Sequence, residues 1–171
     1  MRKQHTGYIN VCERNVSNMA TKYKTLIFVD NNDNCRAPIA KFILMRKFLS
    51  NPMHIESRGL VVLFSEPMVQ KAEEILKEDG YETSGHRAKQ LEQDDVGDDV
   101  LILTMEDKQK SQIWENYENA PHVFSLREYV GAKGDVPDMF GQSVTAYKQF
   151  YTEMELLIRK LVIKLNNEEE L

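Results

Sequence analysis

Apolar residues occur along the chain in short runs that predict buried β-strands. Residues 25–29 (TLIFV) and 100–105 (VLILTM) are continuous apolar runs rich in strand-forming residues. Such runs are typical of parallel strands that are covered on both faces of a sheet. Residues 54–57 and 122–126 are shorter segments that we expect to form two further strands.

The segments between these strands carry the three- and four-residue spacing of amphipathic helices. Four helices are expected. The first begins near Pro38, the second spans residues 65–80, the third ends at about residue 117, and the fourth spans residues 143–165. The apolar spacing of the first helix continues to Leu49. Ser65 is expected to cap the start of the second helix, and Gly80 is placed to end it. Ser143 is expected to cap the start of the fourth helix. This alternation predicts an α/β fold, a three-layer sandwich around a four-stranded parallel sheet.

Length and charge fit a single globular domain. The chain has 171 residues, a formal net charge of −5, and apolar runs far shorter than the ~20 residues that cross a bilayer. We expect residues 1–22 to form a poorly ordered tail and residues 23–166 to form the domain.

The acidic balance argues against a nucleic-acid partner, because binding to a phosphate backbone needs clustered Lys and Arg. The first 20 residues lack the apolar run of a secretory signal, so a cytoplasmic location is expected.

The cysteine content indicates neither a disulfide scaffold nor a metal centre. Cys12 and Cys35 are the only cysteines, and no Cys or His grouping has the spacing of a zinc site. Neither a metal nor another cofactor is therefore expected.

The loop that follows the first strand is the first candidate site. In open α/β sheets a ligand binds beyond the carboxyl ends of the strands. The frame of this loop, LIFV followed by CRAPIAKFIL, resembles the low-molecular-weight protein-tyrosine-phosphatase family. In that family a strand leads through Cys, five residues, Arg, Ser and Pro into a helix. Arg36 matches the catalytic arginine, and Cys35 matches a second cysteine that is not the nucleophile.

Five further segments carry the same resemblance in the same order. They are residues 56–59 (ESRG), 84–88 (SGHRA), 101–105 (LILTM), 126–129 (LREY) and 134–141 (GDVPDMFG). The last is similar to the general-acid loop of bacterial members, in which Asp138 matches the acid and Phe140 matches an aromatic residue of the substrate cleft. The resemblance covers about residues 24–165. It implies the phosphotyrosine protein phosphatase I-like fold and, for an active member, hydrolysis of a phosphomonoester or a phosphoprotein at phosphotyrosine or phosphoarginine.

The chain departs from the family pattern at the nucleophile. The family chemistry needs a thiolate that attacks phosphorus, together with an arginine and N–H groups that hold the phosphate oxygens. Asp30 stands six residues before Arg36, where the family has its cysteine, and Ala37 replaces the hydroxyl residue after the arginine. Asn32 and Asp33 stand at the loop's glycine and asparagine. No cysteine in the chain therefore begins a Cys-x5-Arg motif.

These substitutions also change the charge of the loop. At ~4 Å and an effective dielectric of about 20, two like charges repel by about 4 kcal/mol, so Asp30 and Asp33 are expected to make phosphate binding weak. We expect the Asp30 carboxylate to occupy the loop itself and to pair with Arg36 as a built-in anion. The expected substrate-binding residues are the rest of the loop with the aromatic residue of the acid loop: Asn31, Asn32, Asp33, Asn34, Cys35 and Phe140.

The acid loop and the SGHRA segment each admit a structural interpretation. Asp138 is the candidate general acid, but Met139 stands where the family has proline, and Asp135 and Asp138 can instead serve only to cap a turn. His86 is expected to be a structural hydrogen-bonding residue.

Two functions remain in competition. The first is a pseudophosphatase that binds or regulates a protein or phosphoprotein partner. The alternative is an active hydrolase in which Asp30 replaces the cysteine and forms an acyl phosphate. The aspartate-based phosphatases carry a second Asp two residues later to bind magnesium, and that position is Asn32 here. Catalysis by Cys35 is not expected because it directly precedes Arg36, and arsenate reduction needs later cysteines, whereas none follows Cys35.

Overall fold

The parallel sheet predicted from the apolar runs is present. The computed structural model describes residues 22–167, so the expected tail lies almost entirely outside the described residues. The four strands are β1 Thr25–Asp30, β2 His54–Gly59, β3 Val100–Thr104 and β4 Val123–Ser125. They are all parallel and lie in the order β2-β1-β3-β4, so β1 is central and its carboxyl end lies between those of β2 and β3.

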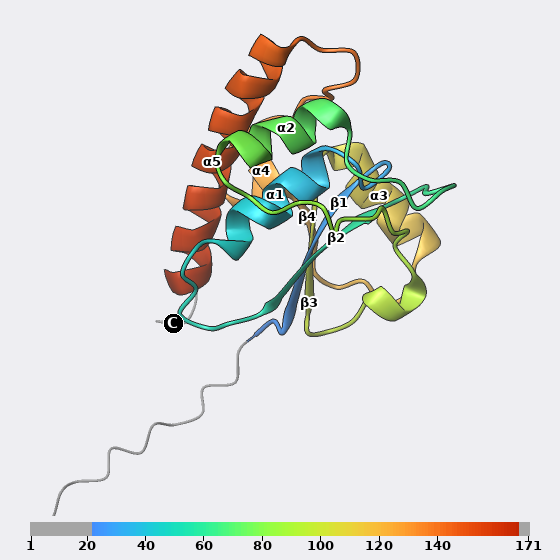
Figure 1. Cartoon of the computed structure of the whole chain (residues 1–171). Helices are drawn as coiled ribbons and strands as arrows, with labels where there is room; N and C mark the ends of the chain where they lie inside the picture. Colours follow the sequence, from blue (N-terminus) through green and yellow to red (C-terminus); the bar gives the residue numbers. More distant parts are fainter. Residues whose placement is uncertain (1–21, 168–171) are drawn as a thin grey trace, which may run out of the picture.

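Helices cover both faces of the sheet (Figure 1). Their bounds are α1 Arg36–Met45, α2 Gln70–Glu78, α3 Asp107–Asn116, α4 Leu126–Tyr129 and α5 Val144–Asn167, with a 3-10 turn at Gln93–Asp95. The long helix α5 packs against α1 and α2. Within residues 22–167, no helix is long and apolar enough to cross a membrane.

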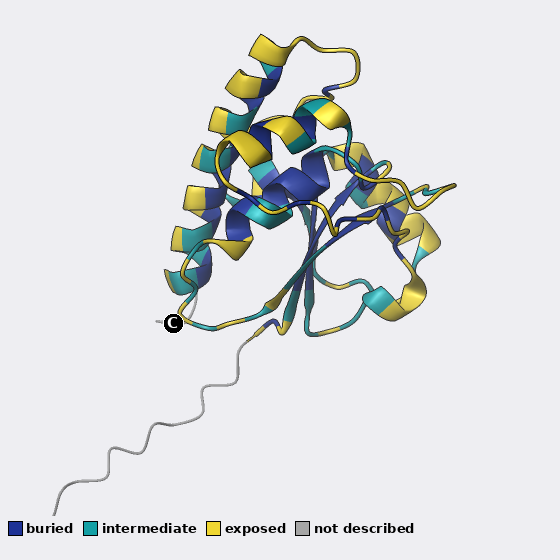
Figure 2. Cartoon of the chain, in the orientation of Figure 1, coloured by how far each residue is buried: buried dark blue, intermediate teal, exposed yellow. Residues whose placement is uncertain are grey.

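Successive side chains of a strand point to opposite faces of the sheet, so the core has two layers. The strands between these layers are largely buried (Figure 2). On one face, Leu26 and Phe28 pack with buried residues of α1, α2, α4 and α5. On the other face, Ile27 and Val29 pack with Ile113 of α3. Both faces of β1 are buried, which explains its continuous apolar sequence.

Most of the expected helix ends are confirmed. Ser143 accepts a hydrogen bond from the N–H of Ala146 in the first turn of α5 (3.1 Å). Gly80 follows the end of α2 with a φ of +77°, a conformation that glycine adopts without strain. Helix α1 ends at Met45, so the apolar spacing that continues to Leu49 does not extend the helix.

The expected start of α2 is wrong. The helix begins at Gln70, and the hydroxyl of Ser65 donates to the carbonyl of Ala88 (3.1 Å) instead of capping a helix. The N–H of Ala88 in turn donates to the carbonyl of Glu66 (2.7 Å). The backbone before α2 therefore pairs with a distant segment, and this tertiary pairing replaces the local helix signal.

Candidate functional site

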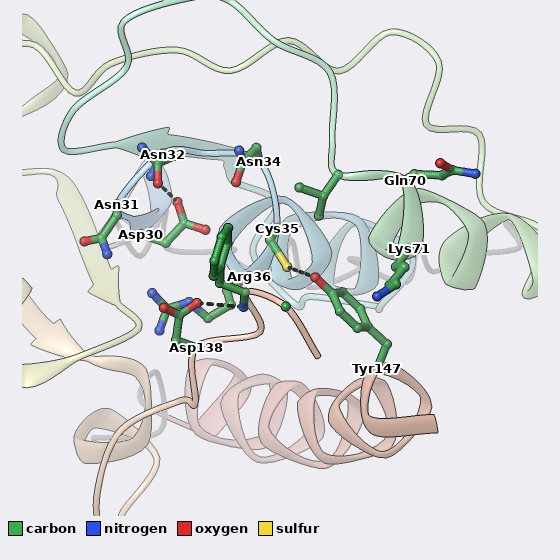
Figure 3. Close-up of a pocket in the computed structure, with 13 residues that line it drawn as sticks. Asp30, Asn31, Asn32, Asn34, Cys35, Arg36, Gln70, Lys71, Asp138 and Tyr147 are labelled. Atoms are coloured by element: carbon green, nitrogen blue, oxygen red, sulfur yellow. Dashed lines mark hydrogen bonds between the residues drawn. The ribbon is translucent and has the colours of Figure 1, made fainter. Parts of the chain in front are cut away.

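The loop between β1 and α1 is closed around the carboxylate of Asp30 (Figure 3). Its Oδ1 accepts hydrogen bonds from the N–H groups of Asp33 (2.6 Å) and Asn32 (3.2 Å). Its Oδ2 accepts from the N–H of Ala37 in the first turn of α1 (2.9 Å). Only 3% of Asp30 is exposed. As the sequence predicts, the side chain of Asp30 takes up the N–H groups of its own loop.

The charge state of Asp30 depends on two opposing effects. Burial raises the pKa of this carboxyl above its ordinary value, and the N–H groups of Ala37, Asp33 and Asn32 and the charge of Arg36 offset only part of this rise. Both oxygens accept N–H donors, an arrangement that favours the ionised form, which is an acceptor only. An ionised Asp30 is then a fixed anion at the N-terminus of α1, where the helix dipole is favourable to negative charge.

Arg36 forms an ion pair with Glu106, a residue that was not predicted from the sequence. Its guanidinium pairs with Glu106, which follows β3 (2.7 Å), and donates to the carbonyl of Val136 (2.9 Å). Glu106 also pairs with Lys108 (2.8 Å). The expected ion pair between Asp30 and Arg36 is wrong. Backbone N–H groups occupy the Asp30 oxygens, and the adjacent strand β3 brings Glu106 against the arginine.

Asp33 faces the interior beneath the loop. It has a φ of +54°, and its side chain is buried, with Oδ2 accepting from the N–H of Lys89 (3.0 Å). Within the described residues, neither Asp33 Oδ1 nor Ser57 Oγ has a hydrogen-bond partner. Burial raises the pKa of Asp33 to about 7. Its carbonyl lies 2.7 Å from Nε2 of His86, which agrees with the structural role expected for that histidine.

Cys35 is not prepared for nucleophilic attack. It precedes α1, and its thiol donates to the hydroxyl of Tyr147 on α5 (3.6 Å). Burial raises the pKa of the Cys35 thiol to about 12, and the negative charges of Asp30 and Asp138 act in the same direction. The thiol therefore remains protonated at neutral pH, whereas the thiolate is the nucleophilic form.

The loop opens into a cleft of about 630 Å³ between α1, α2 and α5. Its walls combine residues expected from sequence with residues that were not. Expected and present are Asp30, Asn31, Asn32, Asn34, Cys35, Arg36, Asp138 and Phe140; missed are Val69, Gln70, Lys71, Gly141 and Tyr147. Asp33 was expected in the cleft, but it is not part of its lining because its side chain points into the protein.

The acid loop forms the rim of the cleft. Oδ1 of Asp138 accepts from the N–H of Phe140 (3.1 Å), and Oδ1 of Asp135 accepts from the N–H of Asp107 (2.8 Å). Asp138 thus caps its own turn, as the structural interpretation proposed, and it also lines the cleft. Asp135 instead holds the first residue of α3, which is distant in sequence. Met139 is buried, while Phe140 is 92% exposed at the rim. Within residues 22–167, no group of three or more His, Cys, Asp or Glu is arranged as a metal site.

Comparisons with known proteins find one family. Residues 25–171 match the family described as low molecular weight phosphotyrosine protein phosphatase. The chain is 34% identical to the low molecular weight protein-tyrosine-phosphatase PtpB of Staphylococcus haemolyticus, over 80% of this chain and 96% of the relative. It is 31% identical to the protein-arginine-phosphatase of Geobacillus stearothermophilus, over 84% of this chain and 97% of the relative.

Solved structures agree with the sequence comparisons. The low molecular weight protein tyrosine phosphatase from T. tengcongensis superimposes with a TM-score of 0.75 at 34% identity, covering 82% of this chain and 98% of that protein. The YwlE arginine phosphatase from Geobacillus stearothermophilus gives 0.76 at 30% identity, covering 86% and 96%. The four-stranded parallel sheet and its helices are therefore those of these phosphatases.

Proposed function

From the premise that this chain belongs to the low molecular weight phosphotyrosine protein phosphatase family, we propose that it is a pseudophosphatase, a cytoplasmic member that binds a partner and does not hydrolyse phosphate esters. In this proposal Asp30 occupies the position of the cysteine nucleophile. The scaffold, the loop and the cleft are kept, and the attacking thiolate is lost.

The observation that carries this proposal is the position of the Asp30 carboxylate. Three loop N–H groups, those of Asn32, Asp33 and Ala37, donate to it. In a phosphatase of this kind, such N–H groups and a helix N-terminus hold the phosphate oxygens. A carboxylate that already accepts these donors competes with phosphate for them, and its negative charge repels the dianion.

Arg36 supports the same conclusion. A catalytic arginine stabilises phosphate charge only if its guanidinium can turn to the phosphate. Here it is 4% exposed and is engaged by the Glu106 carboxylate at 2.7 Å. Transfer of the guanidinium to a ligand would leave Glu106 with Lys108 as its remaining ion-pair partner within the described residues.

One observation favours the alternative function, hydrolysis through Asp30. A solved structure similar to this chain is the YwlE arginine phosphatase mutant with a phosphorylated active site serine, with a TM-score of 0.73 and 30% identity. In that protein the phosphate is carried by a serine, that is, by an oxygen atom of the active site. In this chain the N–H groups of Asp33 and Ala37 donate to Oδ1 and Oδ2 of Asp30, which stabilises the unreacted carboxylate and makes it a weaker nucleophile.

Hydrolysis of para-nitrophenyl phosphate from pH 5 to 8, with and without magnesium, tests the proposal. The native protein is compared with the double variant Asp30→Cys, Ala37→Ser, which restores the thiol and the hydroxyl of the family pattern. We expect no turnover by the native protein and measurable turnover by the double variant. The double variant Asp30→Ser, Ala37→Ser is the matched control, because it changes the same positions without providing a thiol.

Native turnover that Asp30→Asn abolishes would overturn the proposal and make Asp30 the nucleophile. In that case, intact-protein mass spectrometry after an acid quench would detect an acyl phosphate as an added phosphoryl group that hydroxylamine removes. Native turnover that survives Asp30→Asn but not Cys35→Ala would overturn it in favour of the remaining cysteine of the loop.

A further inference from the structure

We propose that the cleft and the apolar segment beside it bind a peptide of a partner protein, with an unmodified arginine side chain in the cleft and an apolar neighbour on the segment. This inference rests on the proposed function, because it needs a cleft that no longer selects phosphate. It names the chemical class of ligand that the altered cleft favours.

The distribution of ion pairs around the cleft indicates a cationic ligand. Both cations of its lining already have protein acceptors. Arg36 pairs with Glu106, and Lys71 donates to the carbonyl of Gln142 at 2.5 Å. The two carboxylates of the lining, Asp30 and Asp138, form no ion pair with any residue between 22 and 167.

Both carboxylates retain acceptor sites for such a ligand. Each carboxylate oxygen can accept two hydrogen bonds. Oδ2 of Asp30 accepts one, from Ala37, and the single hydrogen bond to Asp138 within the described residues reaches Oδ1 from Phe140. Asp30 and Asp138 both line the cleft, as does Cys35, so the two carboxylates face the same cavity.

Aromatic rings line the same space and favour arginine over lysine. Phe140 stands at the rim and Tyr147 forms the α5 wall. A planar guanidinium can stack on such rings while it donates to carboxylates in a fixed fork, whereas an ammonium is a compact and strongly hydrated charge. Figure 3 shows Asp138 and Tyr147 entering the cleft from the acid loop and from α5, opposite the loop that carries Asp30.

An apolar segment, defined here as residues 61–64, extends the cleft on its other side. Leu63 is 82% exposed and Phe64 is 75% exposed. The segment projects from the body of the molecule after β2 (Figures 1 and 2). It lines a smaller hollow that shares Asn32 and Asn34 with the cleft, so the two surfaces are continuous.

The backbone of this segment is fixed although its side chains face solvent. The N–H of Val61 donates to the carbonyl of Asn31 (2.9 Å), and the amide of Asn32 donates to the carbonyl of Val61 (3.1 Å). The N–H of Val62 donates to the side chain of Gln90 (3.2 Å). Large apolar side chains held in solvent on an ordered backbone are typical of a protein interaction site. The two carboxylates without ion pairs, Asp30 and Asp138, select the occupant by charge complementarity, and the apolar segment selects a peptide over a free small cation.

Two pools of acetylated five-residue peptides test the inference. Both pools have randomised flanking residues, and their central residue is arginine in one and citrulline, its neutral isostere, in the other. Each pool is passed over the immobilised full-length protein, and the retained peptides are quantified and sequenced. We expect about tenfold more arginine than citrulline peptide to be retained, because charge-assisted hydrogen bonds are the stronger ones, and we expect apolar residues to be enriched beside the arginine.

Variants separate the two parts of the surface. Asp138→Asn is expected to reduce the preference for arginine at least threefold, with Asp98→Asn, an exposed aspartate outside the cleft, as its control. The double variant Leu63→Ser, Phe64→Ser is expected to keep that preference and to lose the apolar enrichment. Ile163→Ser, on an exposed position of α5, is its matched control and should change neither.

Equal retention of the two pools would overturn the inference, as would a preference for arginine that Asp138→Asn leaves intact. A retained pool without apolar enrichment would overturn the part assigned to the segment. Free arginine amide that competes as well as the selected peptides would show a small cation as the ligand and would also overturn it. The proposed function is judged separately by phosphate ester hydrolysis, so either one can fail while the other stands.

Discussion

The buried carboxyl of Asp33 predicts that this protein loses stability as the pH rises towards neutrality. Its ordinary pKa of 3.8 applies to the unfolded chain, and burial raises the pKa to about 7 in the folded protein. Between these values the folded state holds a proton that the unfolded chain has released. Raising the pH across this window therefore favours the unfolded chain, and the loss is complete only above the folded-state pKa.

The perturbation is Asp33→Asn, which removes the titration and keeps the shape of the side chain. The amide oxygen can still accept from the N–H of Lys89, and its NH2 group can donate to the hydroxyl of Ser57, which has no partner within the described residues. Linkage gives the magnitude: with pKa values of 3.8 and about 7, the native protein loses about 2.5 kcal/mol relative to the variant between pH 5 and pH 8.

Urea unfolding at pH 5, 6, 7 and 8, followed by circular dichroism, measures this difference. The free energy of unfolding of Asp33→Asn minus that of the native protein should grow steadily with pH. The exposed Asp98→Asn controls for the loss of a surface carboxylate and should run parallel to the native protein. A difference between Asp33→Asn and native that stays constant from pH 5 to 8 would refute the reasoning, because it would mean that Asp33 titrates alike in both states.

Two further substitutions test contacts around the loop. Glu106→Gln leaves the buried guanidinium of Arg36 without its carboxylate and is expected to lower the free energy of unfolding by about 3 kcal/mol, measured from the urea midpoint. Lys108→Gln removes the exposed partner of the same carboxylate, and a loss as large as that of Glu106→Gln would contradict this assignment. Gly59→Ala places a Cβ within 2.6–2.9 Å of a side chain and of the loop backbone, so it should destabilise by about 2 kcal/mol in the same assay. Gly97→Ala, whose nearest atoms lie 3.8 Å or more away, is its control, and equal effects of the two would show that the close approach is not what matters.

The central strands could be predicted from sequence because their environment is the same along their whole length. Both faces of β1 and β3 are covered, so nearly every residue is apolar and the pattern needs no knowledge of partners. The start of α2 could not be predicted in this way. Ser65 is a local signal for a helix start, but the backbone there pairs with Ala88, more than twenty residues later.

The same distinction separates the expected and the missed parts of the candidate site. The contacts of Asp30 are local, since its N–H donors lie within seven residues, and a strand that runs into a helix brings them together. The partner of Arg36 lies seventy residues away on the chain. Only the strand order, with β3 next to β1, brings Glu106 to the guanidinium, and the apolar pattern of the strands does not fix this order.

Two carboxylates, those of Asp30 and Glu106, stabilise the conformation of the loop between β1 and α1. A loop that gathers N–H groups for an anion is strained or solvated when the anion leaves, because its donors lose their acceptor. With Asp30 in place the donors have an acceptor that is part of the chain, and with Glu106 in place Arg36 has one too. In the proposed pseudophosphatase, charged groups of the chain itself thus maintain the geometry of the family's loop. The outer cleft, lined by Asp138 and Tyr147, is then free to bind a cationic ligand in place of the phosphate anion.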